Sequence, residues 1–294
     1  MPKWLATTAT ITFEVRDRVA HITLNRPEKR NAINKQMLAE LKAALLEADD
    51  LKSVHCILLQ GAGKDFCAGY DLEGGYAGKQ EEPDHDPADY RGRDSFDDDL
   101  WQLRLGGEAR MAIFDIFKPV IAKVHGNCLA GGTDLALMCD MVVAATDARI
   151  GFPATRAIGS PANHMWLYHC GPQWAKYMLM TGDTMAGRDA ARIGLVMKAF
   201  APDRLDAGAE ALARRIAHGS ADLLAAHKRI VNVGLELMGA RTLQRMAGEN
   251  DGRAHRSRAF AQFFDVMGEH GLKEALRQRD TPYGEGLVSL DDTP

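Results

Sequence analysis

Two short apolar runs each lead into a glycine-bearing loop, and this pattern limits the possible fold more than any other feature. CILLQG at 56–61 is followed by AGKDFCAGYDL, and PVIAKV at 119–124 is followed by HGNCLAGGTDL. A helical segment over 133–139 and another apolar run, MVVAA at 141–145, come next. Buried strands that alternate with helices are typical of parallel βαβ crossover units. The pattern therefore predicts an α/β fold with a parallel sheet.

The segments on either side of these runs predict the rest of the architecture. TITFEV at 10–15 and VAHITL at 19–24 alternate in polarity and predict a β-hairpin. Asn34 is the predicted N-cap of an amphipathic helix. Beyond Pro202 every segment is helix-like, and we expect no further strand.

The chain is therefore expected to have two parts. Residues 1–200 form the α/β core, and residues 201–294 form a helical region. The apolar faces of that region pack either on the core or on another subunit, and both alternatives are open at this point.

Composition excludes several classes of function. The 294-residue chain has a net charge of -4, which provides no basic field for nucleic acid. Its first residues, MPKWLATTATITFEVRD, contain no apolar core flanked by a cleavage site, and no stretch approaches the roughly 20 apolar residues that span a bilayer, so we expect a cytoplasmic protein without a membrane partner. Its 5 cysteines are odd in number and too widely spaced for a CxxC clip, which favours reduced thiols and no metal site.

An acidic tract occupies residues 73–99. Its length and charge predict a surface loop, with a helix resuming near Leu100. Because the tract begins directly after one of the glycine-bearing loops, a lid over a site is the functional alternative.

The two glycine-bearing loops, 60–72 and 125–135, are the candidate site. Glycine lets a backbone approach a ligand closely, and the first amides of a helix have no acceptor inside it. If the loops converge, one amide from each can hold the oxygen of a polarised carbonyl. A nucleotide site is disfavoured, because GAGKDF lacks the third glycine of GxGxxG and its GK lacks the P-loop glycine at the required offset.

Four motifs, in order along the chain, resemble the crotonase (enoyl-CoA hydratase/isomerase) superfamily. NRPEKRNAIN is similar to the family's NRPxxxNAL, and KDFCAGYDL to its FxAGxDL loop. HGNCLAGGTDLALMCDMVVAATDARIGFP is similar to NGxAxGGGxELALxCDxxxAxxxAxFGxPE, and TGDTMAGRDAARIGLV to TGxxxxAxxAxxxGLV. These motifs span most of residues 20–200.

The resemblance implies a spiral of ββα units with a C-terminal helical region that assembles trimers, often paired into hexamers. It implies an acyl-CoA substrate and no separate cofactor, since coenzyme A is part of the substrate. The oxyanion-hole amides fall on Tyr70 and Gly131, where only the backbone NH is required. The positions that match the family's CoA contacts are Lys29, Arg30, Asn31, Ala32, Ala68, Gly69 and Asp71.

Asp134 is the candidate catalytic residue. It lies where the resemblance implies the first of two catalytic glutamates of the hydratases. The alternative is a first-turn carboxylate that only interacts with the helix dipole, which is worth about 0.3–1 kcal/mol.

The sequence departs from the family at the second acid. The FGxPE segment reads IGFPATRAIG here, so Ala154 occupies the position of the second glutamate. Hydration needs a base on water and an acid for the α-carbon, and one aspartate is a poor replacement for two glutamates. The resemblance also weakens simple double-bond isomerisation, because family isomerases usually keep an acid at this position.

The segment after Ala154 departs as well, since GSPANHMWLYHCG replaces the family's PGxGGTQRL. This region lines the acyl pocket in the family, so Ala154, Arg156, His164 and Trp166 are candidate pocket residues. Arg156 is a candidate partner for Asp134 or for a substrate carboxylate. Packing in the core is the alternative for Trp166, and a structural hydrogen bond is the alternative for His164.

We therefore expect an acyl-CoA-processing lyase of the enoyl-CoA hydratase/isomerase type, with weak activity on short enoyl-CoA. The reaction is hydration or a related enolate step, such as isomerisation, decarboxylation or thioester hydrolysis. The alternative is an oligomeric module that binds acyl-CoA but has lost turnover. The acyl group, the reaction and the choice between trimer and hexamer are left open by the sequence.

Overall fold

The computed structural model describes residues 2–76, 89–92 and 95–291. The strands are β1 Ile11–Arg16, β2 Val19–Leu24, β3 Cys56–Gly61, β4 Val120–Val124, β5 Asn127–Leu129, β6 Met141–Ala145, β7 Arg149–Gly151, β8 Thr184–Ala186, β9 Lys198–Phe200 and β10 Leu287–Val288. They form a larger sheet, β1-β2-β3-β4-β6-β9, and a smaller one, β10-β8-β7-β5. Apart from the antiparallel β1–β2 pair, neighbours in the larger sheet run parallel. The predicted α/β class is confirmed.

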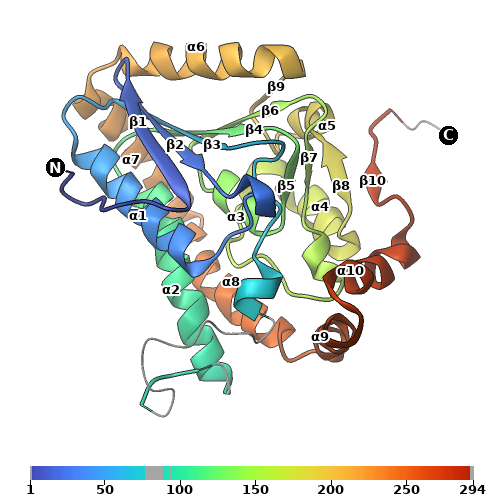
Figure 1. Ribbon diagram of the computed structural model, residues 1–294. Helices are drawn as coiled ribbons and strands as arrows, with labels where there is room; N and C mark the ends of the chain where they lie inside the picture. The colour runs from blue at the N-terminus through green and yellow to red at the C-terminus, as the bar shows by residue number, and fades with distance from the viewer. Residues whose placement is uncertain (1, 77–88, 93–94, 292–294) are drawn as a thin grey trace.

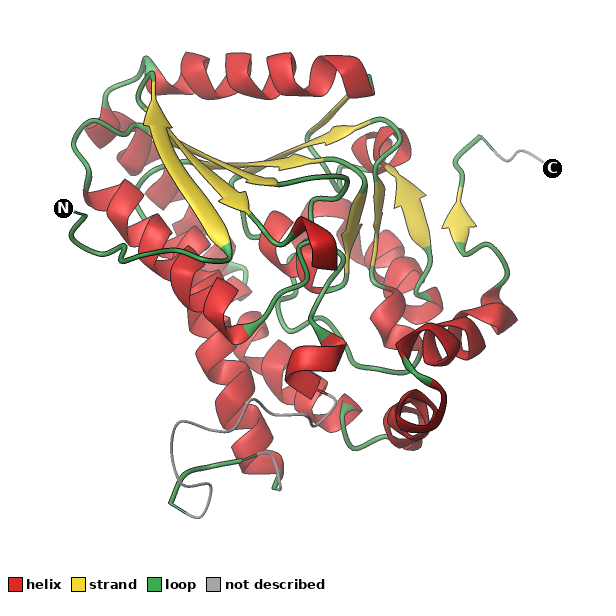
Figure 2. Ribbon diagram, viewed as in Figure 1, coloured by secondary structure: helices red, strands yellow, loops and turns green. Residues whose placement is uncertain are grey.

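Helices cover both faces of the larger sheet. The α-helices are α1 Lys35–Asp50, α2 Phe96–Asp115, α3 Gly131–Ala136, α4 Trp166–Thr181, α5 Gly187–Arg192, α6 Leu205–Ala217, α7 Ala221–Leu237, α8 Ala240–Ala254, α9 Arg258–His270 and α10 Leu272–Asp280. In Figure 2 the strands of the larger sheet lie between α6 above and the helices below. The main hydrophobic cluster fills this space, so the sheet is buried on both sides.

The chain passes repeatedly from one sheet to the other. β4 lies in the larger sheet and β5 in the smaller, and the same holds for β6 and β7 (Figure 1). The turn between β4 and β5 requires glycine, because a Cβ on Gly126 would lie 2.0 Å from the carbonyl oxygen of Lys64. Only glycine can make this bend, and both β5 and α3 follow it along the chain.

Local sequence signals explain the N-terminal elements. The hairpin turn at Asp17 and Arg18 has φ of 50° and 62°, the handedness that a two-residue β-hairpin prefers. Asn34 caps α1 as predicted, because its side chain accepts a hydrogen bond from the Met37 amide at 2.8 Å.

Two helix boundaries and one strand differ from the sequence predictions. α2 begins at Phe96 and not near Leu100, because Ser95 caps it and the acidic residues that follow suit a helix N-terminus. α3 begins at Gly131, two residues before the predicted start. The expectation of no strand beyond Pro202 is wrong, since β10 pairs in parallel with β8.

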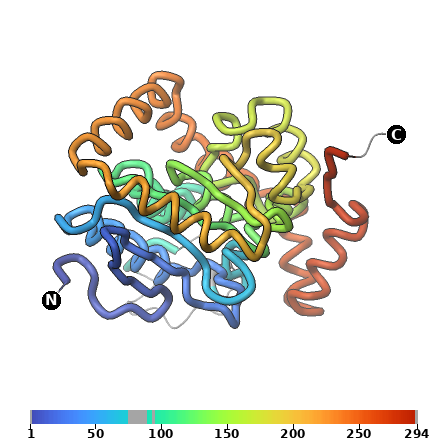
Figure 3. The backbone as a smooth tube through the Cα atoms, turned by 90° about the horizontal axis from the view of Figure 1, so that it is seen from above, coloured from blue at the N-terminus to red at the C-terminus, as the bar shows by residue number. Residues whose placement is uncertain are grey.

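One part of the C-terminal region packs on the core, and another part forms a separate hydrophobic cluster. Seen from above in Figure 3, α6 lies across the larger sheet, and its Ala209 and Ala213 belong to the main cluster. The α9–α10 hairpin instead forms a small cluster around Phe263 and Ala275, which packs against Ile158. Residues 77–88 and 93–94, where most of the predicted lid falls, lie outside the described residues. Within the described residues no helix is long and apolar enough to span a membrane.

Candidate active site

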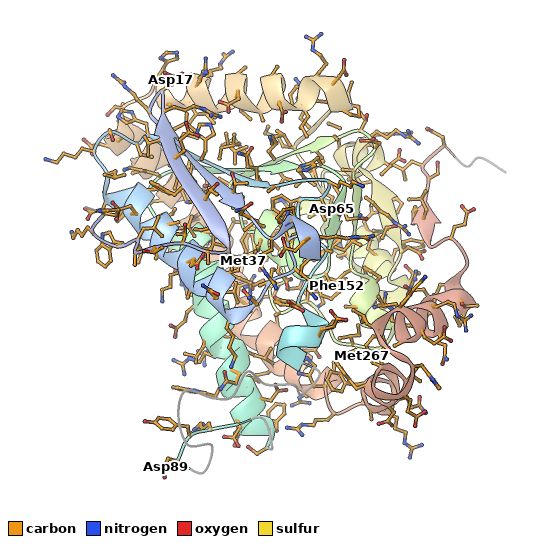
Figure 4. All side chains as sticks on the ribbon, viewed as in Figure 1. Asp17, Met37, Asp65, Asp89, Phe152 and Met267 are labelled. Carbon is orange, nitrogen blue, oxygen red and sulfur yellow. The ribbon has the colours of Figure 1, made fainter. Side chains whose placement is uncertain are left out.

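The two glycine-bearing loops converge, which is the condition for one amide from each to face the same oxygen. The backbones of Cys67 and Cys128 form an isolated parallel β-bridge, and the Leu129 amide donates a hydrogen bond to the Cys67 carbonyl at 3.0 Å. Asp65, labelled near the centre of Figure 4, accepts hydrogen bonds from the Asn127 amide at 2.8 Å and from its side chain at 2.6 Å. The loop after β3 is therefore joined to β5 along its length.

Glycine is required where the loops touch. A Cβ on Gly69, whose φ is +111°, would lie 3.7 Å from the Gly131 nitrogen, so the main chain before Tyr70 lies against the start of α3. A Cβ on Gly132 would lie 2.5 Å from the Cys67 carbonyl oxygen. Ala130, just before α3, has φ 47° and ψ -118°, a strained conformation for a residue with a side chain. Such strain is concentrated at functional sites.

Asp134 lies in the first turn of α3 and is buried, with 1% exposure. The Tyr70 hydroxyl donates to its Oδ2 at 2.8 Å, and the Asn163 amide donates to its Oδ1 at 3.4 Å. Burial raises the pKa of Asp134 to about 7, although the positive charge of Arg110 and the Tyr70 hydrogen bond oppose this rise. The carboxyl can therefore hold or release a proton near neutral pH.

A buried polar layer that the sequence analysis missed supports Asp134. The Arg110 guanidinium from α2 donates to the Asn163 side chain, whose amide donates in turn to Gln244 of α8 at 3.1 Å. All three side chains are buried. Arg110 lies on the buried face of α2, within EARMAIF. A charged residue on the apolar face of a helix is rarely buried without a partner, and this signal could have pointed to the polar layer.

The other face of this layer borders a cavity of about 870 Å³ between α2 and α8, lined in part by Asn163 and Gln244. Gly107 and Gly248 face the cavity from the two helices. Glycine inside a helix costs about 1 kcal/mol relative to alanine. At these two positions the helices are therefore less stable than they would be with alanine, and the missing side chains leave the cavity open.

The structure corrects the partner predicted for Arg156. Its guanidinium pairs with Asp183 at 2.9 Å and with Asp280 at 3.1 Å, and it does not pair with Asp134. It also stacks on Tyr283, with 4.2 Å to the ring centroid. Arg156 thus ties α4 to the C-terminal hairpin, because two carboxylates are available to it there.

Ala154, Trp166 and His164, the other candidates of this segment, make backbone, packing and hydrogen-bonding contacts within the protein. Ala154 lies in a short 3₁₀ helix, Pro153–Arg156, and its carbonyl accepts from the Ile158 amide at 2.7 Å. Trp166 is fully buried in the main cluster, which favours the core alternative. The His164 amide donates to Gln244 at 2.8 Å, and burial lowers the pKa of its imidazole, which favours a neutral ring.

The structure brings the candidate CoA contacts together. The first-motif segment 26–33 pairs with the loop 68–71, since Ala68 N donates to Arg30 O at 3.0 Å and Ile33 N to Gly69 O at 2.8 Å. Asn31 is fully buried, and its amide donates to the carbonyls of Ala62 and Asp65, so its side chain holds the loops together.

The remaining candidates lie beside these two segments. Ala32 follows Asn31 in the first-motif segment. Asp71 pairs with Arg26 at 2.8 Å, and Lys29 pairs with Glu73 at 2.8 Å near the surface. The Arg30 side chain is 71% exposed. Lys29 and Arg30 are thus the candidates that solvent reaches.

The described residues show neither a reactive cysteine nor a metal cluster at this site. Burial raises the pKa of the Cys67 thiol to about 12, so Cys67 is a packing residue and not a nucleophile at neutral pH. Within the described part of the chain, no group of three or more His, Cys, Asp or Glu side chains is placed to hold a metal ion.

Comparisons with known proteins agree with this fold and loop arrangement. Residues 14–264 match the family described as enoyl-CoA hydratase/isomerase. A probable enoyl-CoA hydratase of Rhizobium meliloti (strain 1021) is 36% identical over 231 residues, which are 78% of this chain and 83% of the relative. A crotonyl-CoA hydratase of Syntrophomonas wolfei is 31% identical over 238 residues, 77% of this chain and 82% of that protein.

Solved structures give the same result over almost the whole chain. An enoyl-CoA hydratase of Mycobacterium smegmatis superposes with a TM-score of 0.86 at 38% identity and covers 96% of this chain and 98% of its own. An enoyl-CoA hydratase/isomerase of Xanthobacter autotrophicus Py2 has a TM-score of 0.84 at 33% identity, with coverage of 94% and 99%. The predicted spiral core with a helical C-terminal region is confirmed, and the chain belongs to the enoyl-CoA hydratase/isomerase family of the crotonase superfamily.

Proposed function

We propose that this protein is an enzyme that acts on an acyl-CoA thioester by stabilising an enolate. The backbone amides of Tyr70 and Gly131 hold the thioester oxygen, and Asp134 transfers the proton. The observation that carries the proposal is the environment of Asp134, a buried carboxyl with a pKa of about 7 in the turn that begins at Gly131. A proton-transfer group works best when its pKa lies near the working pH.

The chemistry follows from the direction in which charge moves. When a base removes the α-proton of a thioester, the electrons of the C–H bond form the C=C bond of an enolate, and the π electrons of the carbonyl move to its oxygen. Two amides from converging loops stabilise that oxygen because they are already oriented when the charge develops. The carboxylate of Asp134 takes the proton and becomes a neutral acid, which returns the proton in the reverse step.

Ala154 governs which reaction is expected. A methyl group replaces the second carboxylate at this position. Hydration needs one group that protonates the α-carbon and one that activates water, and the site has only one carboxylate for these two roles. We therefore expect enolate formation to be faster than water addition to a short enoyl-CoA. Binding of acyl-CoA without turnover is the second candidate, and the same substitution favours it.

The remaining contacts of the substrate extend from the oxyanion amides in two directions. The CoA portion lies along the first-motif segment 26–33 and the loop 68–71, where Lys29 and Arg30 supply positive charge for phosphates. The acyl group extends past Asp134 toward Asn163 and the cavity between α2 and α8. This cavity is large enough for an acyl chain of medium length.

Filling the cavity is expected to change chain-length preference. Gly248→Leu places a side chain where a Cβ on Gly248 meets no atom within 4 Å, so the helix tolerates it. We expect kcat/KM for octanoyl-CoA exchange to fall at least about tenfold, the effect of roughly 1.4 kcal/mol, while butyryl-CoA is unaffected. The matched control is Gly268→Leu in α9, where added atoms also meet open space. Equal loss for both substrates would contradict the placement of the acyl chain.

A homo-oligomer, trimer or hexamer, is part of the proposal. Helix α7 and its C-cap residue Met238 support it with exposed apolar side chains, in particular Leu223, Ile230, Val231, Leu237 and Met238. Exposed apolar surface of this extent is typical of a subunit interface.

The test of the proposed function uses two substrates in deuterated water. Crotonyl-CoA reports water addition and butyryl-CoA reports exchange of α-protons, both by mass spectrometry, beside the Asp134→Asn variant. Exchange that depends on Asp134 supports the proposal, and addition that depends on it identifies a hydratase with one carboxylate. Binding of both thioesters without either event would favour the module without turnover and contradict the enzyme.

A further inference from the structure

The side chain of Tyr70 has a position that an oxyanion hole does not require. The hole uses the backbone amide of this residue, and any side chain is compatible with that role. Here the hydroxyl donates to Oδ2 of Asp134 at 2.8 Å. Tyr70 thus supplies its backbone amide to the proposed oxyanion hole and its side-chain hydroxyl to the acid on the other loop.

The main chain of Tyr70 is held independently of its ring. Ile33 N donates to Gly69 O at 2.8 Å and Asp71 N donates to Ile33 O at 2.9 Å, so backbone hydrogen bonds flank Tyr70 on both sides. Removing the hydroxyl should therefore leave the amide in place.

The ring itself is packed against the start of α3. A Cβ on Gly131 would lie 2.8 Å from the ring carbon Cε2 of Tyr70, which places the ring directly over Gly131. The Arg110 guanidinium lies 5.8 Å from the ring centroid. The ring thus reaches from the predicted oxyanion amide to the carboxyl of Asp134, one turn further along α3, and its direction is set by packing.

The hydroxyl acts on Asp134 together with several other groups. A hydrogen-bond donor favours the carboxylate over the neutral acid, and so opposes the effect of burial. The positive charge of Arg110 acts in the same direction, and the charge of Asp251 in α8 acts in the opposite one. The titratable and charged groups around Asp134 are Tyr70, Arg110, Asp251, Cys67 and Cys128.

We propose that Tyr70 is a positioning residue whose hydroxyl orients Asp134 and favours its carboxylate form over the neutral acid, so that one carboxylate serves a site where Ala154 replaces the second. The inference rests on the proposed function. In the forward step the α-C–H bond breaks and its electron pair forms the C=C bond of the enolate, the π pair of the C=O bond moves to the thioester oxygen, and the proton forms an O–H bond on Asp134. The reverse step restores the C–H bond and the carboxylate, and the Tyr70 hydroxyl keeps its own proton throughout.

The first experiment measures the pH profile of butyryl-CoA α-proton exchange in deuterated water for the wild type and Tyr70→Phe. We expect the midpoint of the profile to move upward by about one pH unit, which corresponds to the loss of one hydrogen bond to a charged group. At a pH one unit below the wild-type midpoint, the rate should fall about tenfold. Tyr177→Phe is the matched control, because the Tyr177 hydroxyl also donates to a carboxylate, that of Asp183 at 3.1 Å, away from the site.

A second experiment needs no turnover. The folded carboxyl of Asp134 keeps its proton up to a pH of about 7, whereas the unfolded chain releases it near pH 4, so this group lowers wild-type stability as the pH rises between these values. In urea unfolding across this range, the free energy of unfolding of Tyr70→Phe should keep declining to a higher pH than that of the wild type. In Asp134→Asn this component should be missing.

The outcomes separate the two proposals. Exchange that persists in Asp134→Asn overturns the proposed function and this inference with it. If Asp134→Asn loses exchange but the profiles of Tyr70→Phe and the wild type coincide, the positioning role is wrong and the proposed function stands. A shifted profile in both experiments, with Tyr177→Phe unchanged, supports the inference.

Discussion

Replacing Asp134 with asparagine is expected to lower the rate of α-proton exchange on butyryl-CoA by roughly 10²- to 10⁴-fold, the usual contribution of a general acid–base group. Asparagine has the same shape, and its oxygen can accept the hydrogen bond from the Asn163 amide while its NH2 group faces the Tyr70 hydroxyl, but it cannot take up the proton. Single-turnover exchange followed by mass spectrometry measures the loss. Binding of butyryl-CoA by calorimetry should stay near the wild-type value, which separates lost chemistry from lost binding.

The pH dependence of the wild type gives an independent check on Asp134. With a pKa of about 7, the carboxyl is neutral at lower pH and ionised above it. Only the ionised form removes a proton, so the exchange rate should rise through pH 7 and then reach a plateau. A rate that falls over the same range would show that another group is the base.

Replacing Lys228 with methionine is expected to lower the free energy of unfolding by about 1.5–3 kcal/mol, the usual contribution of a hydrogen bond to a charged group, because Lys228 is buried while the Asp140 side chain keeps 19% exposure. Lys228 of α7 has a buried side chain whose Nζ lies 2.9 Å from Oδ2 of Asp140. The same Nζ donates to the carbonyls of Ile113 and Lys118. Methionine fills the space but leaves Asp140, whose pKa is already raised by burial, without its counter-charge. Urea denaturation measures the change.

The matched control for Lys228 is the same substitution at an exposed ion pair. Lys3 lies 2.7 Å from Asp50, but the two side chains are 67% and 48% exposed. Because solvent screens such a pair, Lys3→Met should lower the free energy of unfolding much less than Lys228→Met does. A similar loss at both positions would mean that Lys228 contributes through general charge and not through the buried contact with Asp140.

The features that local sequence could predict are those in which neighbouring residues act on each other. The hairpin turn at Asp17 and Arg18, the Asn34 cap and the strand of residues 141–145 follow from alternation, capping and short apolar runs. The convergence of the loops 60–72 and 125–135 was also predictable, because parallel strands deliver their following loops to one edge of a sheet. The start of α2 at Phe96 was harder, because an acidic run is read equally well as a loop or as a helix N-terminus.

Partners of charged side chains could not be predicted, because they depend on segments far apart in the chain. From its place near the missing acid, Arg156 is a candidate partner for Asp134 or for a substrate carboxylate, yet Asp183 and Asp280 hold it, one of them 124 residues away. Arg110, which does lie near Asp134, belongs to a helix that follows the acidic tract and carried no motif.

By itself the sequence determined the family, the order of the strands and loops, and the presence of an acid just after the glycines. These are properties of residue type and spacing, and they persist in any packing of the chain. Only the tertiary structure decided that Asp134 is buried beneath the Tyr70 hydroxyl, that Asn163 and Gln244 link it to α8, and that a cavity borders this layer. The physical reason is that desolvation and hydrogen bonding depend on which distant side chains surround a group, and these interactions set the protonation of a buried acid.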